Sequence, residues 1–542
     1  MEFDLIVRNG TIVDGTGRPR FRADLGLREG QIAAIAEGEP LQGQNLLDAD
    51  GLVVAPGFVD VHSHADWILP LSDHDAILAP LLLQGVTTVV TGHCGFSPAP
   101  VTDADIPLAD AYSEMVRDRA FDYRWRSFGE FLAELERGGL LLNAAFLVGH
   151  GALRYAVLGD STGAPDPGQL EDLRRGVRRA MAEGALGLSA GLAYAPGVFA
   201  RNDELLPLLR TVAELGGAFT VHGRAYSWIS PFYSPMIGGI AHNIRSVREL
   251  LGLAREAGVR LQLSHQIFVG RRTWRTHRTV LRDIERAAAA GLDVAFDAFP
   301  YTCGNETINV VLPPWFLADF DRHICDPRSL KRLKRVIDGE RWVLGLDYGD
   351  ITLLQVGAPD LAELEGLDIG AIGRRLRMSG FEAYLHVARA SGGKARILLS
   401  TYSGDDEHED PLRAALSHPL CSFMTDTILT QHGRPNPGSY GTFPRILGRY
   451  SRDLGLFSLE EAVRRMTSYP AQRMNLAAVG RIAEGVAADL VLFDPATIAD
   501  RTTRNRPDAP PIGIHTVLIG GQIVAQNGRL LPGPLRGRVL RR

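Results

Sequence analysis

A repeating unit of an amphipathic helix, a glycine and a short apolar strand runs through the middle of the chain. The unit occurs at 170–189, 204–221, 247–263 and 279–296. Glycine readily adopts the left-handed conformation that ends a helix, so each unit has a defined helix end before its strand. Short buried strands that alternate with helices predict a parallel sheet with right-handed crossovers.

Counting the strands indicates that this sheet closes into a barrel. The candidates are Val53–Val61, Thr87–Thr91, Ala144–Val148, Ala185–Ser189, Ala218–Val221, Leu261–Leu263, Val294–Phe296, Ile397–Thr401 and Ser422–Met424. A (β/α)8 barrel takes eight strands, and we expect Ile397–Thr401 to be the one that lies outside. The stretch 303–393 is too long for an ordinary loop, so it predicts an inserted lid subdomain over one end of the barrel.

Both ends of the chain have a different pattern, in which short strands are separated by turns. At the amino end, Asn9-Gly10 separates Asp4–Val7 from Thr11–Val13, and Asn-Gly is a hairpin signal. At the carboxyl end the candidate strands are Asp489–Phe493, Thr516–Ile519 and Gln522–Val524. Because β segments from the two ends of a chain commonly meet, we expect them to form one module.

The predicted fold class is therefore α/β. A TIM-like (β/α)8 barrel is expected over 56–474, with the insertion at about 303–393. A small β-sandwich is expected from 1–55 together with 475–542.

The composition excludes several classes of function. Lys and Arg number 58 against 63 Asp and Glu, a net charge of −5, and no glycine-rich phosphate loop is evident, so nucleic acid is not an expected partner. Only four cysteines are present, which favours a reducing compartment. The first residues do not resemble a signal peptide, and no apolar run approaches the ~20 residues of a membrane span. We therefore expect a cytoplasmic protein with a small-molecule substrate and no membrane partner.

Candidate metal ligands follow the carboxyl ends of the predicted barrel strands, which is where such barrels place their active sites. These candidates are His62, His64, Cys94, His222, His265 and Asp426. His62 and His64 are separated by one residue, so both side chains point to the same side of a strand and can bind one metal ion. Each candidate alone has a structural explanation, but their shared position at strand ends predicts a metal site.

Several segments resemble the amidohydrolase superfamily and, within it, the N-acyl-D-amino-acid deacylases, or D-aminoacylases. The segments are APGFVDVHSH at 55–64, GHCGFS at 92–97, GLSAGLAY at 187–194, GTFPR at 441–445 and AADLVLFDP at 487–495. The resemblance extends over most of the chain and is weakest over 303–393. It implies a metal-dependent enzyme that hydrolyses a C–N acyl bond.

The resemblance also implies a role for each candidate ligand. His62 and His64 would hold the more weakly bound Zn²⁺, and His222 and His265 would hold the tighter one. Cys94 would bridge the two positions. Asp426 would contact the metal and act as the general base. One or two zinc ions per chain are consistent with this pattern.

The sequence departs from the family where the substrate carboxylate is expected to bind. The family's lysine is replaced by Ile267, and glycine or serine at 438–439 occupies the place of its arginine. We therefore expect a substrate that is neutral or whose carboxylate lies elsewhere, not a standard N-acyl-D-amino acid. The residues expected to contact the substrate are Arg224, Gln266, Tyr194 and Asn305. Replacement charge could come from Arg271, Arg272 or Arg434, although the favoured interpretation of each is an exposed surface arginine.

Other features have simpler interpretations. We expect His93 to be a hydrogen-bonding group behind the ligands, and the acidic run at 405–410 to be a solvated loop.

Two alternative functions stay open. One is a metal-dependent hydrolase of a cyclic amide, ester or lactone, and the other is a non-catalytic binding protein with the same fold. Homo-oligomerisation is also open.

Overall fold

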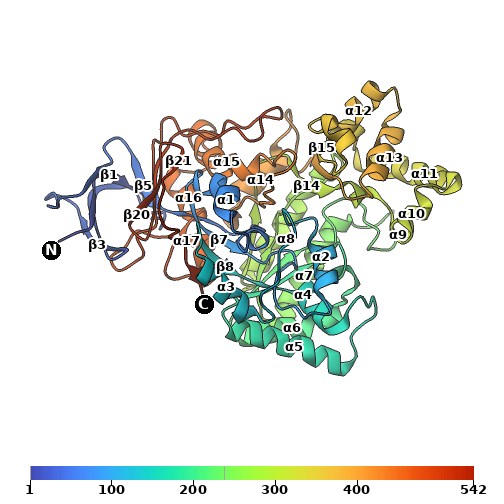
Figure 1. Ribbon diagram of the computed structural model, residues 1–542, viewed down its shortest axis with the longest axis horizontal. Coiled ribbons are helices and arrows are strands. Elements are labelled where there is room, and N and C mark those ends of the chain that lie inside the picture. Colours follow the sequence, from blue (N-terminus) through green and yellow to red (C-terminus); the bar gives the residue numbers. More distant parts are fainter. Residues whose placement is uncertain (1, 237) are drawn as a thin grey trace.

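A closed parallel barrel forms the centre of the molecule (Figure 1). The computed structural model describes residues 2–236 and 238–542. Within them, the barrel strands are β6 (Phe58–Asp60), β7 (Val86–Thr91), β8 (Asn143–Phe146) continued by β9 (Val148–Gly149), β10 (Gly187–Gly191), β11 (Ala218–His222), β12 (Arg260–Leu263), β13 (Val294–Ala298) and β17 (Cys421–Phe423). An isolated parallel bridge between Ser63 and Thr427 joins β17 to β6 and closes the ring. The predicted fold class is confirmed.

Amphipathic helices cover the outside of the barrel. They include α1 (His74–Leu82), α2 (Ile106–Ser113), α3 (Phe128–Gly138), α4 (His150–Leu158), α5 (Pro167–Ala182), α6 (Asn202–Glu214), α7 (His242–Ala257), α8 (His277–Ala289) and α14 (Asp410–Ser417). Every residue of β7 and β10 is buried, because these strands have the barrel interior on one face and helices on the other. Gly258 ends α7 in the left-handed conformation, with φ of 68°, as predicted for the repeating unit.

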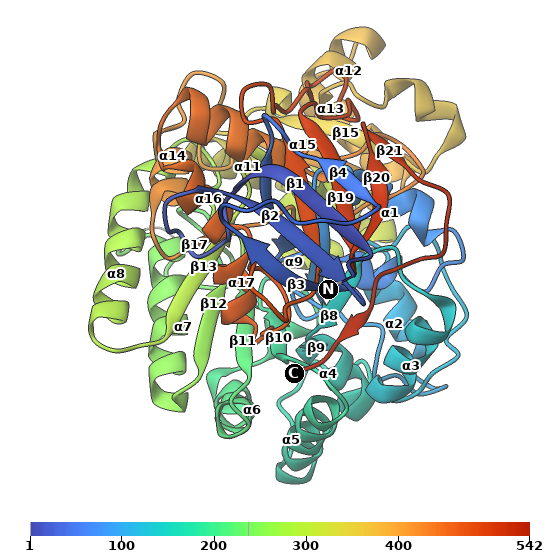
Figure 2. The same ribbon diagram turned by 90° about the vertical axis from the view of Figure 1, so that its left-hand side faces the viewer.

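The two ends of the chain meet in one mixed sheet, seen face-on in Figure 2. Its strands are β1 (Leu5–Ile12), β2 (Phe21–Arg28), β3 (Gln31–Ala36), β4 (Leu46–Asp48), β5 (Val53–Pro56), β18 (Leu490–Phe493), β19 (Ile514–Ile519), β20 (Gln522–Gln526) and β21 (Arg529–Leu530). Strand β5 pairs with both β1 and β18, so it joins the amino-terminal strands to the carboxyl-terminal ones.

Two details of the predicted strands are wrong. Asn9-Gly10 does not form a hairpin but a bulge within β1, where Asn9 has φ of 61° and its N–H donates to Asp24 Oδ1 at 2.9 Å. The predicted strand Val53–Val61 is two strands, since β5 belongs to the terminal sheet and β6 to the barrel. The chain passes from one sheet to the other at Gly57, where a Cβ would lie 2.1 Å from Thr87 Oγ1.

An inserted unit lies at the end of the molecule opposite the terminal sheet (Figure 1). It contains β14 (Cys303–Thr307), β15 (Ile351–Gln355), β16 (Arg396–Ser400), α9 (Pro314–Leu317), α10 (Phe320–His323), α11 (Pro327–Leu344), α12 (Ile369–Leu376) and α13 (Gly380–Ala390). Its three strands form a separate antiparallel sheet, which confirms that Ile397–Thr401 lies outside the barrel. Strand β16 belongs to the insert although it follows residue 393.

The remaining elements connect the barrel to the terminal sheet. They are α15 (Gly438–Arg445), α16 (Leu459–Arg465), α17 (Ser468–Arg473) and β22 (Val539–Leu540). Strand β22 leaves the terminal sheet and pairs with β8 of the barrel. In the described part of the chain, no helix has both the length and the apolar character needed to cross a membrane.

Candidate metal centre

The predicted ligands converge at one end of the barrel because each follows the carboxyl end of a strand. His62 and His64 follow β6, and Cys94 follows β7. His222 is the last residue of β11, His265 follows β12, and Asp426 follows β17. Five different strands therefore contribute to one site.

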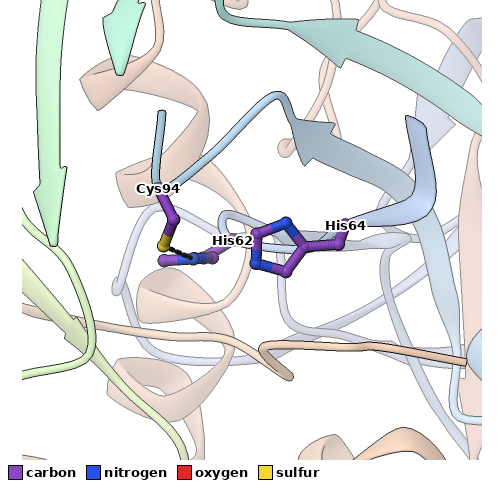
Figure 3. Close-up of side chains that lie close together, drawn as sticks. All are labelled: His62, His64 and Cys94. Atoms are coloured by element: carbon purple, nitrogen blue, oxygen red, sulfur yellow. Dashed lines mark hydrogen bonds between the residues drawn. The ribbon is translucent and has the colours of Figure 1, made fainter. Parts of the chain in front are cut away.

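Cys94 lies at the centre of this group. Its Sγ is 3.3 Å from His62 Nε2 and 3.5 Å from His265 Nε2. Figure 3 shows the thiol facing the His62 ring, with the His64 ring beyond it. Two ligand sets of three, His62–His64–Cys94 and Cys94–His222–His265, each place their donor atoms within 4.8 Å of one another. Because both sets include Cys94, the geometry suits a thiolate shared between two metal positions.

Asp426 borders the first ligand set. Its Oδ1 is 3.5 Å from His62 Nε2 and 3.7 Å from His64 Nε2. In the second set, His222 Nδ1 lies 3.0 Å from His265 Nε2. All six predicted ligands thus lie within one continuous group.

Three of these residues have a strained backbone. Cys94, His265 and Asp426 have φ of 56°, 33° and 52°, in the left-handed region that non-glycine residues rarely adopt. Such conformations cluster at functional sites, where the surrounding structure enforces them. Here they turn the chain immediately after a strand, so that the side chain points toward the group.

Asp297 positions two of the histidines, and it was missed in the sequence. Its Oδ1 is 3.3 Å from His62 Nδ1 and accepts the backbone N–H of His265 at 2.6 Å. Its Oδ2 accepts a hydrogen bond from Gln262 Nε2 at 3.0 Å. The contact to Nδ1 leaves Nε2 of His62 facing Cys94, the usual arrangement behind a metal-binding histidine. Its place at the end of the predicted strand Val294–Phe296 could have revealed it.

Burial controls the protonation of the site. Burial and the charge of His265 lower the pKa of His64 to about 3, and burial lowers that of His265 to about 4. Burial raises the pKa of Asp426 to about 8, with further repulsion from Asp297, Glu306 and Asp60. Burial also raises the pKa of the Cys94 thiol. The site therefore combines neutral imidazoles with acids that lack a compensating cation.

This donor set fits zinc. Imidazole nitrogen, thiolate and carboxylate are its usual ligands, and a divalent cation would favour the ionised forms of Cys94 and Asp426. His62, His64, Cys94, His222 and His265 could hold one or two zinc ions, with Asp426 beside them.

His93 does not have the predicted hydrogen-bonding role. Its ring stacks on that of His62, with centroids 4.0 Å apart and an interplanar angle of 16°. Neither ring nitrogen has a hydrogen-bond partner among the described residues. The correction follows from packing, because the ring is fully buried against His62 and supports it by contact.

The residues predicted to contact the substrate differ in their surroundings. Tyr194 donates its hydroxyl proton to the carbonyl of Cys94 at 2.9 Å. Gln266 Nε2 and Asn305 Oδ1 are buried without a hydrogen-bond partner in the described structure, so both can still bind a ligand. The Arg224 guanidinium contacts Glu249 Oε1 at 3.1 Å and the carbonyl of Ala200 at 2.6 Å. The substrate roles of these four residues stay predictions.

The arginines considered as replacement charge also differ. Arg271 forms a two-pronged ion pair with Asp350, at 2.8 and 3.0 Å, and also approaches Asp405 of the acidic run. The guanidinium of Arg272 lies over the Trp342 ring, 4.4 Å from its centroid. Arg434 lines a cavity beside the insert.

Comparison with known proteins places this site in a family context. The model of the Amidohydrolase family matches residues 45–312 and 354–525. The D-aminoacylase of Alcaligenes xylosoxydans xylosoxydans is 33% identical over 541 residues, which cover 100% of this chain and 98% of that protein. The N-acyl-D-glutamate deacylase of the same organism is 32% identical over 544 residues, covering 100% and 97%.

Solved structures show the same relationship. The N-acyl-D-glutamate deacylase from Bordetella bronchiseptica, complexed with zinc and a phosphonate inhibitor, is 30% identical with a TM-score of 0.81 and full coverage of both chains. A D-aminoacylase described as having a binuclear metal centre is 30% identical with a TM-score of 0.80, again over both full chains.

Proposed function

This chain belongs to the amidohydrolase family and, within it, to the D-aminoacylase family; on that premise we propose that it is a zinc-dependent hydrolase of the C–N acyl bond of an N-acyl amino compound. The observation that carries the proposal is the convergence of His62, His64, Cys94, His222 and His265 on one buried group, with Asp426 beside it. A binding protein would not need this complete set, which argues against the non-catalytic alternative.

Each residue has a role in the proposed reaction. The four histidines and Cys94 would hold the metal, and bound zinc would polarise the amide carbonyl and make a water molecule more acidic. Asp426 would accept the proton of the attacking water and pass it to the leaving nitrogen as the amide bond breaks. Asp297 would keep His62 and His265 oriented, and Tyr194 would hold the backbone of Cys94 in place.

The substrate is proposed to differ from a standard N-acyl-D-amino acid. Ile267 is an apolar, buried residue at the position of the family's lysine, and residues 438–439 carry no charge where the arginine is expected. Two charge-assisted contacts to a carboxylate are thus lost, each worth about 1.5–3 kcal/mol. A cyclic amide, ester or lactone is the second candidate, favoured by the same missing cations.

A substrate panel tests the proposal. Zinc-loaded protein is incubated with N-acyl D- and L-amino acids, their esters and amides, cyclic amides and lactones, and the released amine, acid or alcohol is measured. We expect amine release from at least one N-acyl compound and poor hydrolysis of N-acetyl-D-methionine. Efficient hydrolysis of N-acetyl-D-methionine would contradict the substrate assignment. Turnover of cyclic amides or lactones alone would favour the second candidate.

A further inference from the structure

A cavity lies between the insert and the loops at the end of the barrel. Its wall includes Asn305, Thr307 and Arg396 from the insert, and Ile428, Arg434 and Asn436 from the barrel side. Ile428 follows Asp426 by two residues, and Asn436 lies two residues before Gly438, where the segment 438–439 replaces the family's arginine. Two residues of the cavity wall, Ile428 and Asn436, thus lie close in sequence to the proposed general base and to the region that lacks the family's cation.

Arg396 brings an uncompensated positive charge to this cavity. It lies on β16, where its Nη2 donates to the carbonyls of Glu114, at 3.3 Å, and Arg117. Its Nη1 is buried and has no hydrogen-bond partner, and among the described residues no carboxylate lies within 4 Å of the guanidinium. A buried guanidinium nitrogen without a partner is unfavourable, so Nη1 of the half-buried Arg396 is suited to bind an anion.

The acids closest to Arg396 are already paired with other cations. Glu114 contacts Lys394 Nζ at 2.9 Å, and Asp118 contacts Arg119 Nη1 at 2.9 Å. Neither acid forms an ion pair with Arg396, although the charges of both favour its ionised form.

Arg434 adds a second cation to the same wall. Its side chain lies across Gly366, where a Cβ would come within 2.5 Å of the guanidinium Nε. The only hydrogen bond that its guanidinium forms with the described residues is a long one, from Nη1 to the carbonyl of Asn505 at 3.4 Å. In the described structure it has no ion pair with a carboxylate. Because Gly366 has no side chain, the guanidinium of Arg434 can lie directly against it.

Glu306 is the acid that lines this cavity, and it does not pair with either arginine. Thr307 lies opposite Arg396 across the β14–β16 pair, and side chains alternate along a strand, so Glu306 extends to the other face. There its Oε1 accepts the hydroxyl proton of Tyr402 at 2.8 Å. Glu306 is thus the negative group of the cavity wall, but among the described residues it forms no ion pair with Arg396 or Arg434.

The geometry points to Arg396 and Arg434 as the binding site for a substrate carboxylate that is carried at a distance from the scissile amide. This inference rests on the proposed function and specifies its substrate class, namely N-acyl compounds whose carboxylate is separated from the amide nitrogen by a spacer, such as N-acyl-ω-amino acids. Arg224 and Arg271 are already engaged by Glu249 and Asp350, and Arg272 stacks on Trp342. The two arginines of the cavity would replace the lysine and arginine that the sequence lacks.

Binding measurements test this inference independently of turnover. The probes are N-acetylglycine, N-acetyl-β-alanine, N-acetyl-4-aminobutyrate and N-acetyl-6-aminohexanoate, each paired with its uncharged carboxamide. Dissociation constants are measured by calorimetry for the zinc-loaded wild type, Arg396→Gln and Arg434→Gln, each also carrying Asp426→Asn so that the probes are not hydrolysed during the titration. In the wild type, we expect at least one longer acid to bind about tenfold or more tightly than its amide, because charge-assisted hydrogen bonds are the stronger kind. Both variants should lose most of that preference without a change in affinity for the amide.

Lys331→Gln is the matched control, since it removes an exposed cation of the insert that lies on α11, outside the cavity wall. It should bind like the wild type. Arg434→Gln alters an exposed side chain, so it tests the site even if Arg396→Gln fails to fold. Equal binding of acids and amides by the wild type, or no binding of any acid, would overturn the inference. Amide hydrolysis by the corresponding zinc-loaded proteins with Asp426 intact would show that the proposed function is unaffected by such a result.

Discussion

At the scale of single residues, the site depends on contacts that fix the direction of each donor atom. Cys94 is held by its left-handed backbone and by the hydrogen bond from Tyr194 to its carbonyl. His62 is fixed from behind by Asp297 and from the side by the stacked ring of His93. The metal site is therefore largely preformed by the protein, which predicts that its supporting residues affect metal affinity and that Asp426 affects turnover.

Replacement of Asp426 by Asn should leave metal binding nearly unchanged but remove most of the activity. The amide keeps the size of the side chain but cannot accept the proton of the attacking water, and a general base contributes about 10²–10⁴-fold. Zinc content by mass spectrometry and kcat on the best substrate of the panel check this. Asp406→Asn, in the exposed acidic loop, is the control and should match the wild type. Near wild-type kcat in Asp426→Asn would exclude the assigned base.

Replacement of Asp297 by Asn should weaken zinc binding about 10- to 100-fold, the usual cost of losing a group behind a metal ligand. Asp297 accepts from Gln262 and from the backbone of His265 and also contacts His62, so an amide NH₂ would face a donor at one of these positions. Competition with a chromogenic chelator measures the affinity. Unchanged affinity would show that Asp297 does not position the histidines.

At the scale of elements, the carboxyl ends of the barrel strands position the candidate metal ligands, and the helices hold the strands in position. Helices α4 and α6 are joined by a fully buried charge group in which Glu204 Oε1 lies 2.8 Å from His150 Nε2 and 3.1 Å from Arg154 Nε. Burial raises the pKa of Glu204, but His150 and Arg154 outweigh it and bring the pKa below its ordinary value of 4.5. The ionised carboxylate therefore stabilises the fold.

Glu204→Gln should lower the free energy of unfolding by about 3–5 kcal/mol at neutral pH, since it leaves Arg154 buried without its partner. Because the folded-state pKa of Glu204 is lowered, its contribution is complete well above pH 4.5 and decreases as the pH falls through the folded value. Urea unfolding of both proteins from pH 7 down to pH 4 measures this. A constant difference across the acidic range, or none at pH 7, would show that the carboxylate is not ionised in this role.

Gly57→Ala should destabilise the fold by about 1–3 kcal/mol, the range for overpacking a tight site. The new methyl group would meet Thr87 Oγ1 where the chain passes from β5 to β6. Gly252→Ala, in helix α7 with open space around it, is the control and should be neutral or stabilising. Melting temperatures are measured for both variants by thermal unfolding. Equal values would contradict the tight packing of the chain at Gly57, between β5 and β6.

The sequence predicts the barrel, the terminal module and the ligand positions because helix period and strand ends are local patterns. It does not reveal that Val53–Val61 divides between two sheets, since the division depends on the close approach of Gly57 to Thr87. The ion pair between Arg271 and Asp350 cannot be predicted from the sequence either, because it results from tertiary packing of the insert. Asp297 was missed although its position at a strand end is readable.

At the scale of the whole molecule, the barrel carries the site and the two other units lie on opposite sides of it (Figure 1). The barrel supplies the ligands, and the insert contributes Asn305 and Arg396 to the wall of the cavity. The ligands come from five strands, so a bound metal would also connect segments far apart in sequence. The central claim is that hydrolysis of an N-acyl bond requires the metal held by this group.

Amine release before and after metal removal tests that claim most directly. Purified protein is assayed on the N-acyl panel as isolated, after dialysis against a chelator, and after readdition of zinc. We predict that release is abolished by chelation, restored by one or two equivalents of zinc, and absent from a His62→Ala variant under all conditions. Release that persists in metal-free protein, or that is absent from the whole panel in zinc-loaded protein, would contradict the account.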